Sequence, residues 1–393
     1  MSYSSGGSRR PVLRGELVPL DACRELAGDW AALEREVEGS PFTSWHWVSV
    51  WLEMLPAGVR PWVFRAFDSR GIVALSLLVD APERGAGRLF GRRSWYVHET
   101  GRASLDEITV EYGGLLAARA EQPAAYRALF ETLSRSRDWR RLRIPTSAHG
   151  ESIAAGLPSG MQALSVFARP CYRVDLAAVR AAPDGYVGML GRKTRASLRQ
   201  ALRAYEPLGP LRVDIARDAQ EALAWFDGFE ELHTRHWNAR GEGGCFADAF
   251  FGRFHRALVK GGAEDGFVRM TRVSAGTTPI GYLYNLRWRG TVYYYNAGLN
   301  YGLLLRNDRP GIVSLYAVVE HAAANGDHAL DFLAGDQDYK RRLSTDAVML
   351  HSIDVRPPGV RRRIERLGAR LAGRPSLGES LGLALARPAV SGD

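Results

Sequence analysis

Residues 331–344 read DFLAGDQDYKRRLS and join the end of an apolar strand to a cluster of charged side chains. Gly335 breaks the strand, and residues 337–343 have the composition of a helix. Folds that mix helices with strands place binding and catalytic groups at the C-terminal ends of strands. A solvated turn between two core elements is the alternative interpretation. The candidate functional residues of this stretch are Asp336, Asp338, Tyr339 and Lys340.

The size and composition of the chain limit its class. At 393 residues and 46% hydrophobic content, the chain is long enough to build two cores. Its cysteines, Cys23, Cys171 and Cys245, lack metal-ligand spacing, so we expect neither a disulfide framework nor a metal site. No run approaches the roughly 18 apolar residues of a membrane span. The polar segment 1–11 is unlike a signal peptide, so we expect a disordered leader and a cytoplasmic protein.

Positive charge is in excess over the whole sequence. The formal net charge is +9 at pH 7. A balance of this sign favours a polyanionic partner, such as a nucleic acid, a membrane surface or a cosubstrate that bears phosphates. Charge alone leaves all three open.

The predicted elements follow a similar order in the two halves of the chain. In the first half, residues 40–55 predict a helix with Ser44 as its N-cap, and ITVEYGGLLA at 108–117 predicts a strand. In the second half, residues 185–206 predict one helix, and a second helix begins after its N-cap Asp218. This order suggests a duplicated unit of helices and strands.

Five stretches of the second half match one enzyme family in order and spacing. They are GRKTRASLRQALR (191–203), ELHTRHWNARGEGGCFAD (231–248), YYYNAGLNY (293–301), RPGIVSLYAVVEHAAANG (309–326) and LDFLAGDQDYKRRLS (330–344). These stretches resemble the CelD-like (BioF2-like) acetyltransferase domain of the GNAT superfamily, which is related to the FemAB peptidyltransferases. With SPFTSWHWVSVWLEML and EYGGLLA of the first half, the resemblance covers about residues 40–355.

The resemblance implies an α/β (α+β) fold of tandem GNAT-like (acyl-CoA N-acyltransferase) domains, each a mixed sheet flanked by helices. We therefore expect an N-terminal GNAT-like half over residues 12–175 and a C-terminal GNAT domain over residues 176–356. Residues 357–393 predict a basic amphipathic tail that docks on the body of the protein and makes weak contact with an anionic membrane surface.

The same resemblance implies an activity. An acyl group would pass from acyl-CoA, a co-substrate and not a tightly bound cofactor, to an amine or sugar acceptor in envelope polysaccharide or secondary-metabolite synthesis. FemAB relatives use aminoacyl-tRNA as the donor. The usual phosphate loop of the superfamily is absent, because the corresponding place reads RNDRPG at 306–311. Acyl-CoA and aminoacyl-tRNA both remain open as donors, and a non-catalytic GNAT-like scaffold is a third possibility.

Two groups of residues are candidates for binding the phosphates of the donor. The first is an arginine stripe at helical spacing without acidic partners, for which a solvated helix face is the alternative; it consists of Arg192, Arg195 and Arg199. The second precedes a helix whose first backbone N–H groups are free to bind an anion; it consists of Arg306, Arg309 and Gly311.

The remaining candidates concern catalysis and the acceptor. His233, His236 and Trp237 share one helical face, which is either a buried aromatic face or a site where a histidine takes the proton of an attacking ammonium. We assign Tyr295 and Asn296 of YYYNAGLNY to substrate binding. No base is identifiable beside Cys245 in the sequence, which favours a core or loop cysteine over a nucleophile.

The Gly-Asp-x-x-Tyr-Lys order of the family is the basis for the roles in DFLAGDQDYKRRLS. Lys340 would stabilise negative charge on the carbonyl oxygen or on the leaving group, and Tyr339 would protonate the leaving sulfur or oxygen. Asp336 or Asp338 would position the lysine or bind the acceptor. We expect Lys340 at an exposed mouth, where it contributes little to stability.

Overall fold

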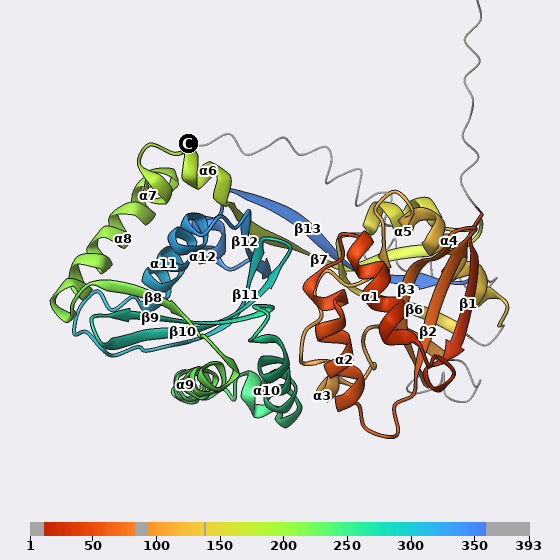
Figure 1. The fold of residues 1–393 in the computed structure, drawn as a ribbon. Helices are drawn as coiled ribbons and strands as arrows, with labels where there is room; N and C mark the ends of the chain where they lie inside the picture. The colour runs from red at the N-terminus through yellow and green to blue at the C-terminus, as the bar shows by residue number, and fades with distance from the viewer. Residues whose placement is uncertain (1–11, 83–92, 137–138, 359–393) are drawn as a thin grey trace, which may run out of the picture.

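The computed structural model describes residues 12–82, 93–136 and 139–358. The expected leader and almost all of the expected tail lie outside these residues. The strands form one 13-stranded sheet in the described parts of the chain, in the order β1-β2-β3-β4-β6-β13-β7-β12-β11-β10-β9-β8, with β5 beside β3. Helices flank this mixed sheet (Figure 1), which confirms the expected fold class. No helix in the described ranges has both the length and the apolar composition needed to span a bilayer.

The strands are β1 (Arg14–Pro19), β2 (Pro61–Asp68), β3 (Gly71–Pro82), β4 (Arg93–Val97), β5 (Leu116–Ala117), β6 (Trp139–Ser147), β7 (Gln162–Asp175), β8 (Leu211–Ile215), β9 (Val268–Ala275), β10 (Thr278–Trp288), β11 (Thr291–Leu299), β12 (Ala329–Ala334) and β13 (Asp346–Arg356). The helices are α1 (Leu26–Glu36), α2 (Trp45–Met54), α3 (Ala103–Asp106), α4 (Gln122–Ser134), α5 (Gly150–Gly156), α6 (Leu176–Ala181), α7 (Gly185–Met189), α8 (Arg192–Tyr205), α9 (Ala219–Asn238), α10 (Ala249–Gly262), α11 (Pro310–Ala324) and α12 (Asp338–Leu343).

The two halves repeat one order of elements. An antiparallel set of strands (β2-β3-β4, then β9-β10-β11) leads into a long helix (α4, then α11), and the next strand (β6, then β12) pairs in parallel with the last of the set. In the second half, α9 and α10 cover one face of the sheet, and α8 and α11 cover the other (Figure 1). One apolar core runs through α1, α2, α9 and α10 and so joins the halves.

A two-stranded ribbon also joins the halves. β13 pairs antiparallel with β7 along almost its whole length and with β6 on its other side. β7 in turn pairs with β12. Figure 1 shows this ribbon running from one half to the other. β7, the last strand of the first half, pairs with β12 and β13 of the second half. Strand pairing therefore links the two expected domains on either side of residues 175–176.

The N-cap of α2 is the residue expected from the sequence. The Ser44 side chain accepts a hydrogen bond from the Trp47 backbone N–H at the start of α2, as expected. Two expectations are wrong. The helix over residues 185–206 is divided at Leu190 and Gly191 into α7 and α8.

The expected strand over residues 108–117 is also wrong, because only Leu116 and Ala117 are in a strand. Thr109 and Tyr112 have φ values of 44° and 50°. These values lie in the left-handed region, which non-glycine residues rarely adopt and which differs from the extended backbone of a regular strand. Residues 107–112 instead form an irregular segment against the second half, where the Tyr295 hydroxyl donates to the Ile108 carbonyl.

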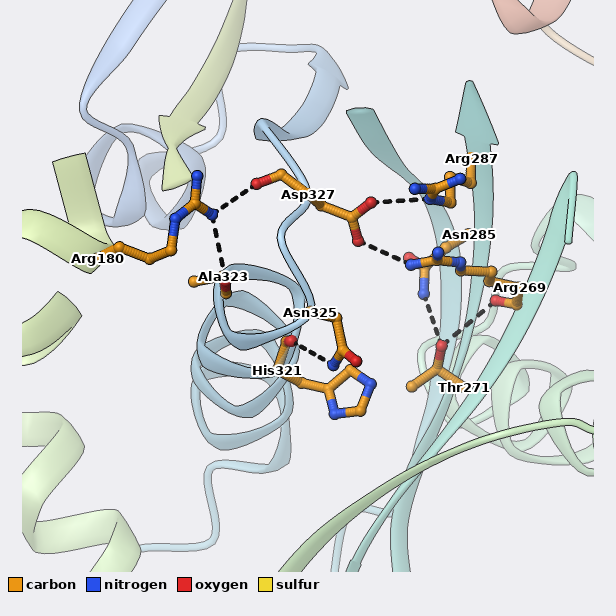
Figure 2. A network of polar contacts seen from close by, with 9 residues as sticks. All are labelled: Arg180, Arg269, Thr271, Asn285, Arg287, His321, Ala323, Asn325 and Asp327. Carbon is orange, nitrogen blue, oxygen red and sulfur yellow. Dashed lines mark hydrogen bonds and ion pairs between the residues drawn. The ribbon is translucent and has the colours of Figure 1, made fainter. Parts of the chain in front are cut away.

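A buried ion cluster fixes the start of β12. The Asp327 side chain has no exposed surface, and its carboxylate accepts from Arg269 of β9 and Arg287 of β10, both at 2.8 Å. The guanidinium of Arg180 on α6 donates to the backbone carbonyls of Asp327 and Ala323 at 2.8 and 3.1 Å (Figure 2). Three elements distant in the sequence therefore meet at one residue between α11 and β12.

Asp327→Asn should destabilise the protein by about 3 kcal/mol, because it leaves two partly buried guanidinium groups without their counter-charge. Urea denaturation of the full chain measures this loss. Asp214→Asn is the matched control, since Asp214 pairs with Arg272 at 3.0 Å while 44% of its side chain is exposed. The control should cost no more than about 1 kcal/mol, and equal losses in the two variants would contradict a special role for Asp327.

Candidate functional site

Strands β11 and β12 separate at the centre of the second half. They pair in parallel only between Thr291–Tyr293 and Ala329–Asp331. Beyond this point β11 stays beside β10, whereas the end of β12 pairs with β7, where Ala334 is opposite Cys171. Leu333, with a φ of 61°, lies at the irregularity that turns β12 away. A cavity of about 520 Å³ lies at the opening between the strands.

The cavity brings together residues of α8, α9, β11, the start of α11 and α12. Among the residues expected from the sequence, those that line it are His233, His236, Trp237, Asn296, Arg309, Gly311, Asp338 and Tyr339. These positions span more than 100 residues of sequence, from α9 to α12. The fold thus brings these eight residues together at one cavity.

The other expected residues lie elsewhere. Asp336 is exposed, pairs with Arg341 at 3.3 Å and accepts from the Tyr172 hydroxyl at 2.8 Å. Tyr295 is on the far side of β11, in the aromatic cluster of α2 and α10. The exposed or half-exposed arginines outside the cavity are Arg192, Arg195, Arg199 and Arg306. On α8, Thr194 and Ser197 line the cavity in place of the arginine stripe.

The N-terminus of α11 forms one end of the cavity. Gly311 and Ile312 line it there, and Pro310 occupies the first turn, where a missing N–H costs nothing. The guanidinium of Arg309 donates to the Ser197 hydroxyl of α8. An exposed cation beside the positive end of a 15-residue helix is suited to binding a phosphate or another anion.

Three titratable side chains of the cavity, those of Tyr339, His236 and His233, favour their neutral forms. Burial raises the pKa of Tyr339 to about 12, so its hydroxyl remains protonated at neutral pH. Burial, with a smaller contribution from Arg240, lowers the pKa of His236, which stacks on Tyr301 with ring centres 4.5 Å apart. Burial likewise lowers the pKa of His233. The cavity thus offers a proton donor and neutral imidazoles.

Lys340 is not at an exposed mouth, so that expectation is wrong. Its side chain is only 6% exposed, and its ammonium donates to the carbonyls of Leu333 and Ala334 at 3.2 and 3.0 Å. Burial lowers the pKa of Lys340, against an opposing effect of Glu111. In α12, Tyr339 lines the cavity, whereas the next residue, Lys340, contacts the end of β12.

A buried polar cluster surrounds this lysine. The Ala334 backbone N–H donates to the Glu111 carboxylate at 2.6 Å. The Asp331 carboxylate accepts from Tyr112, Cys171 and the Leu333 backbone N–H. Glu111 and Tyr112 were not expected from the sequence, because they belong to a segment whose composition predicts a strand. In the sequence, Gly113 and Gly114 of EYGG are the residues that indicate an irregular segment.

Glu111→Gln should make stability less dependent on pH. Burial raises the pKa of Glu111 from its ordinary value of 4.5 to about 7. The folded state therefore keeps a proton that the unfolded chain releases. This contribution to stability is fully present below about pH 4.5 and is lost as pH rises through 7, a loss on the order of 3 kcal/mol.

Denaturation of wild type and variant at several pH values measures the difference. The Gln variant keeps an acceptor for the Ala334 N–H and should show a flatter profile. Glu36→Gln, at an exposed carboxyl of α1, should leave the profile unchanged. Parallel profiles for wild type and Glu111→Gln would show that Glu111 is ionised in the folded protein.

Comparison with known proteins agrees with this geometry. Residues 192–341 match the family model described as "Acetyltransferase (GNAT) domain". No curated protein has significant sequence similarity to the chain. The crystal structure of FemX matches 87% of this chain and 98% of its own at a TM-score of 0.57 and 10% identity.

A second solved structure has the same fold. The C-terminal domain of a putative lysylphosphatidylglycerol synthetase from Agrobacterium fabrum matches 88% of this chain and 96% of its own, at a TM-score of 0.50 and 11% identity. At these identities the two likenesses establish the fold alone. The family match includes both α8 and α12, which border the cavity. Residues 192–341 are thus similar to an acetyltransferase (GNAT) domain, and the two solved structures share the fold of the whole described chain.

Proposed function

We propose that the protein transfers an acyl group from acyl-CoA to an amine or sugar acceptor. The observation that carries this proposal is the cavity at the separation of β11 and β12, with the N-terminus of α11 at one end and Tyr339 at its side. A pantetheine chain between separated strands can satisfy free backbone groups there, and the helix N-terminus can bind the pyrophosphate.

Different residues in and beside the cavity would bind the donor, donate a proton and position the backbone in such a transfer. Arg309 and the first N–H groups of α11 bind phosphate, and the aromatic side chains of Trp237 and Tyr294 border the apolar part of the donor. Tyr339 is the proton donor for the leaving sulfur. Lys340 acts as a positioning residue, because it holds the carbonyls at the end of β12 from the side opposite the cavity.

A second candidate is transfer from aminoacyl-tRNA. The observation that favours it is the arginine stripe Arg192, Arg195 and Arg199, which has no ion pair with any described residue. Unpaired arginines along an exposed helix are suited to the phosphates of a nucleic acid. α8 borders the cavity through Ser197, so RNA on its outer face would lie beside the site.

The donor is identified by binding to the full chain. We expect acetyl-CoA at 100 times its Kd to stabilise the protein by about 2.7 kcal/mol, measured as a higher Tm. Arg309→Ala should weaken this effect, because it removes the cation at α11. The Arg192→Ala, Arg195→Ala, Arg199→Ala triple variant should leave it unchanged.

The second candidate is supported if acetyl-CoA does not raise the Tm and tRNA binds instead. In that case tRNA would bind with an affinity that falls steeply with salt, and the triple variant would lose it. Arg217→Ala is the matched control, since Arg217 is an exposed arginine already paired with Glu221 at 3.0 Å. Neither a Tm shift with acetyl-CoA nor salt-dependent tRNA binding would contradict both donors.

Tyr339→Phe should lower kcat by roughly 100-fold or more, the usual effect of losing a general acid, with little change in donor binding. Release of CoA in the presence of a set of amine acceptors measures it. Tyr172→Phe serves as a control, because Tyr172 bonds to Asp336 beside the same helix but outside the cavity. Equal rates in wild type and Tyr339→Phe would remove Tyr339 from the mechanism.

A further inference from the structure

Residues 107–112 of the first half lie against β11 of the second half. The Tyr112 ring meets the Tyr293 ring edge to face, with centres 5.9 Å apart, and the Tyr295 hydroxyl donates to a carbonyl of the segment. Tyr293 and Tyr295 face the core that joins the halves, whereas Tyr294 between them lines the cavity. The segment therefore contacts β11 on the face opposite Tyr294.

The same segment also binds β12. The Tyr112 hydroxyl donates to the Asp331 carboxylate at 2.5 Å, and the Glu111 carboxylate accepts from the Ala334 backbone N–H at 2.6 Å. Asp331 is the last residue of β12 that pairs with β11, and Ala334 lies beyond the separation of the strands. One short segment of the first half thus contacts both strands at the point where they part.

Side chains bind the backbone of β12 beyond this point. Asp331 accepts from the Leu333 N–H at 2.7 Å, and Lys340 donates to the carbonyls of Leu333 and Ala334. Of the three side chains that bind these two residues, only that of Glu111 comes from the first half. Because Glu111 is only 7% exposed, little water can replace it as the acceptor for the Ala334 N–H.

The segment that carries Glu111 is fixed in place. Ile108 and Val110 are buried in the apolar core that joins the halves. Thr109 and Tyr112 have positive φ values, so the backbone between them follows a path that a strand would not take. A carboxylate on such an anchored segment is a rigid support for its partner.

The end of β12 is in direct contact with the wall of the cavity. The Phe332 ring meets the rings of Tyr294 and Tyr339 edge to face, with centres 6.3 and 6.5 Å apart. Both tyrosines line the cavity. Lys340, which binds the backbone at this end of β12, directly follows Tyr339. A shift of the end of β12 therefore changes the shape of the cavity.

We propose that Glu111 is a positioning residue for donor binding, which holds the end of β12 apart from β11 through its hydrogen bond to Ala334. The inference rests on the proposed acyl transfer from acyl-CoA and extends the donor site to a residue of the first half. Glu111 acts through the backbone of β12 and does not line the cavity. Without its carboxylate, the Ala334 N–H must find another acceptor, and the strand moves from the open position.

The test compares the Kd for acetyl-CoA, measured by isothermal titration calorimetry well below the Tm of each protein. Glu111→Gln keeps an oxygen that accepts from Ala334, so its Kd should stay within about 3-fold of the wild-type value. Glu111→Leu has no acceptor and should raise the Kd at least about 10-fold, because the donor must then bind an open form that is less populated. Glu111→Asp keeps the charge but withdraws the carboxylate by one methylene, and should raise the Kd by about the same factor.

Glu34→Leu is the matched control. The Glu34 carboxylate also accepts a backbone N–H, that of Trp45 at 2.7 Å, but this bond lies within the first half. The variant loses the same kind of hydrogen bond and should have a lower Tm with an unchanged Kd. A residue with a structural role alone would behave like Glu34.

Two results overturn the inference while leaving the proposed function intact. One is a wild-type Kd in Glu111→Asp or in a folded Glu111→Leu. The other is an equal loss of affinity in Glu34→Leu, which would show that any loss of stability weakens donor binding. If wild type itself does not bind acetyl-CoA, the proposed donor fails, and the role of Glu111 in binding it fails as well.

Discussion

The buried Asp327 carboxylate sets the geometry on which the cavity depends. Its two ion pairs hold the start of β12 against β9 and β10, and the His328 backbone N–H donates to the Gly290 carbonyl at 2.6 Å. β12 therefore enters the sheet beside β11 in one register. β12 pairs with β7 from Ala329 to Ala334 but with β11 only over its first three residues, so it stays beside β7 where it leaves β11. The opening between the strands follows from these two fixed ends.

The first half repeats this order of strands and helix. β4 and β6 also pair in parallel, and α4 occupies the place of α11. There the Tyr126 hydroxyl bonds to His149 at 3.0 Å, and Gln122 at the start of α4 bonds to the same ring at 3.1 Å. These side chains fill the region at the helix N-terminus. The first half also supplies residues 107–112, which bring Glu111 to the end of β12.

The sequence predicted those features that depend on neighbouring residues. The N-cap Ser44, the helix after RNDRPG and the shared face of His233 and His236 all follow from local spacing. The contact between the Cys245 thiol and His233 could not be predicted, because it depends on how the loop before Cys245 folds back on α9. The role of Glu111 depends on left-handed residues that resemble a strand in composition. The ribbon of β7 and β13 requires pairing between segments almost 200 residues apart.

The interior of the cavity has consequences for the acceptor. His233, His236 and Tyr339 are all shifted toward their neutral forms by burial, and the charged pair Arg342–Asp338, at 2.6 Å, is largely exposed. An ammonium group that enters such a region loses hydration, which lowers its pKa, and the carboxylates of Asp308 and Asp338 at the border of the cavity act in the opposite direction. Desolvation by the cavity therefore favours the neutral amine, which is the form that can attack an acyl carbon. Under the proposed acyl transfer, the apolar part of the wall would thus favour the reactive form of an amine acceptor.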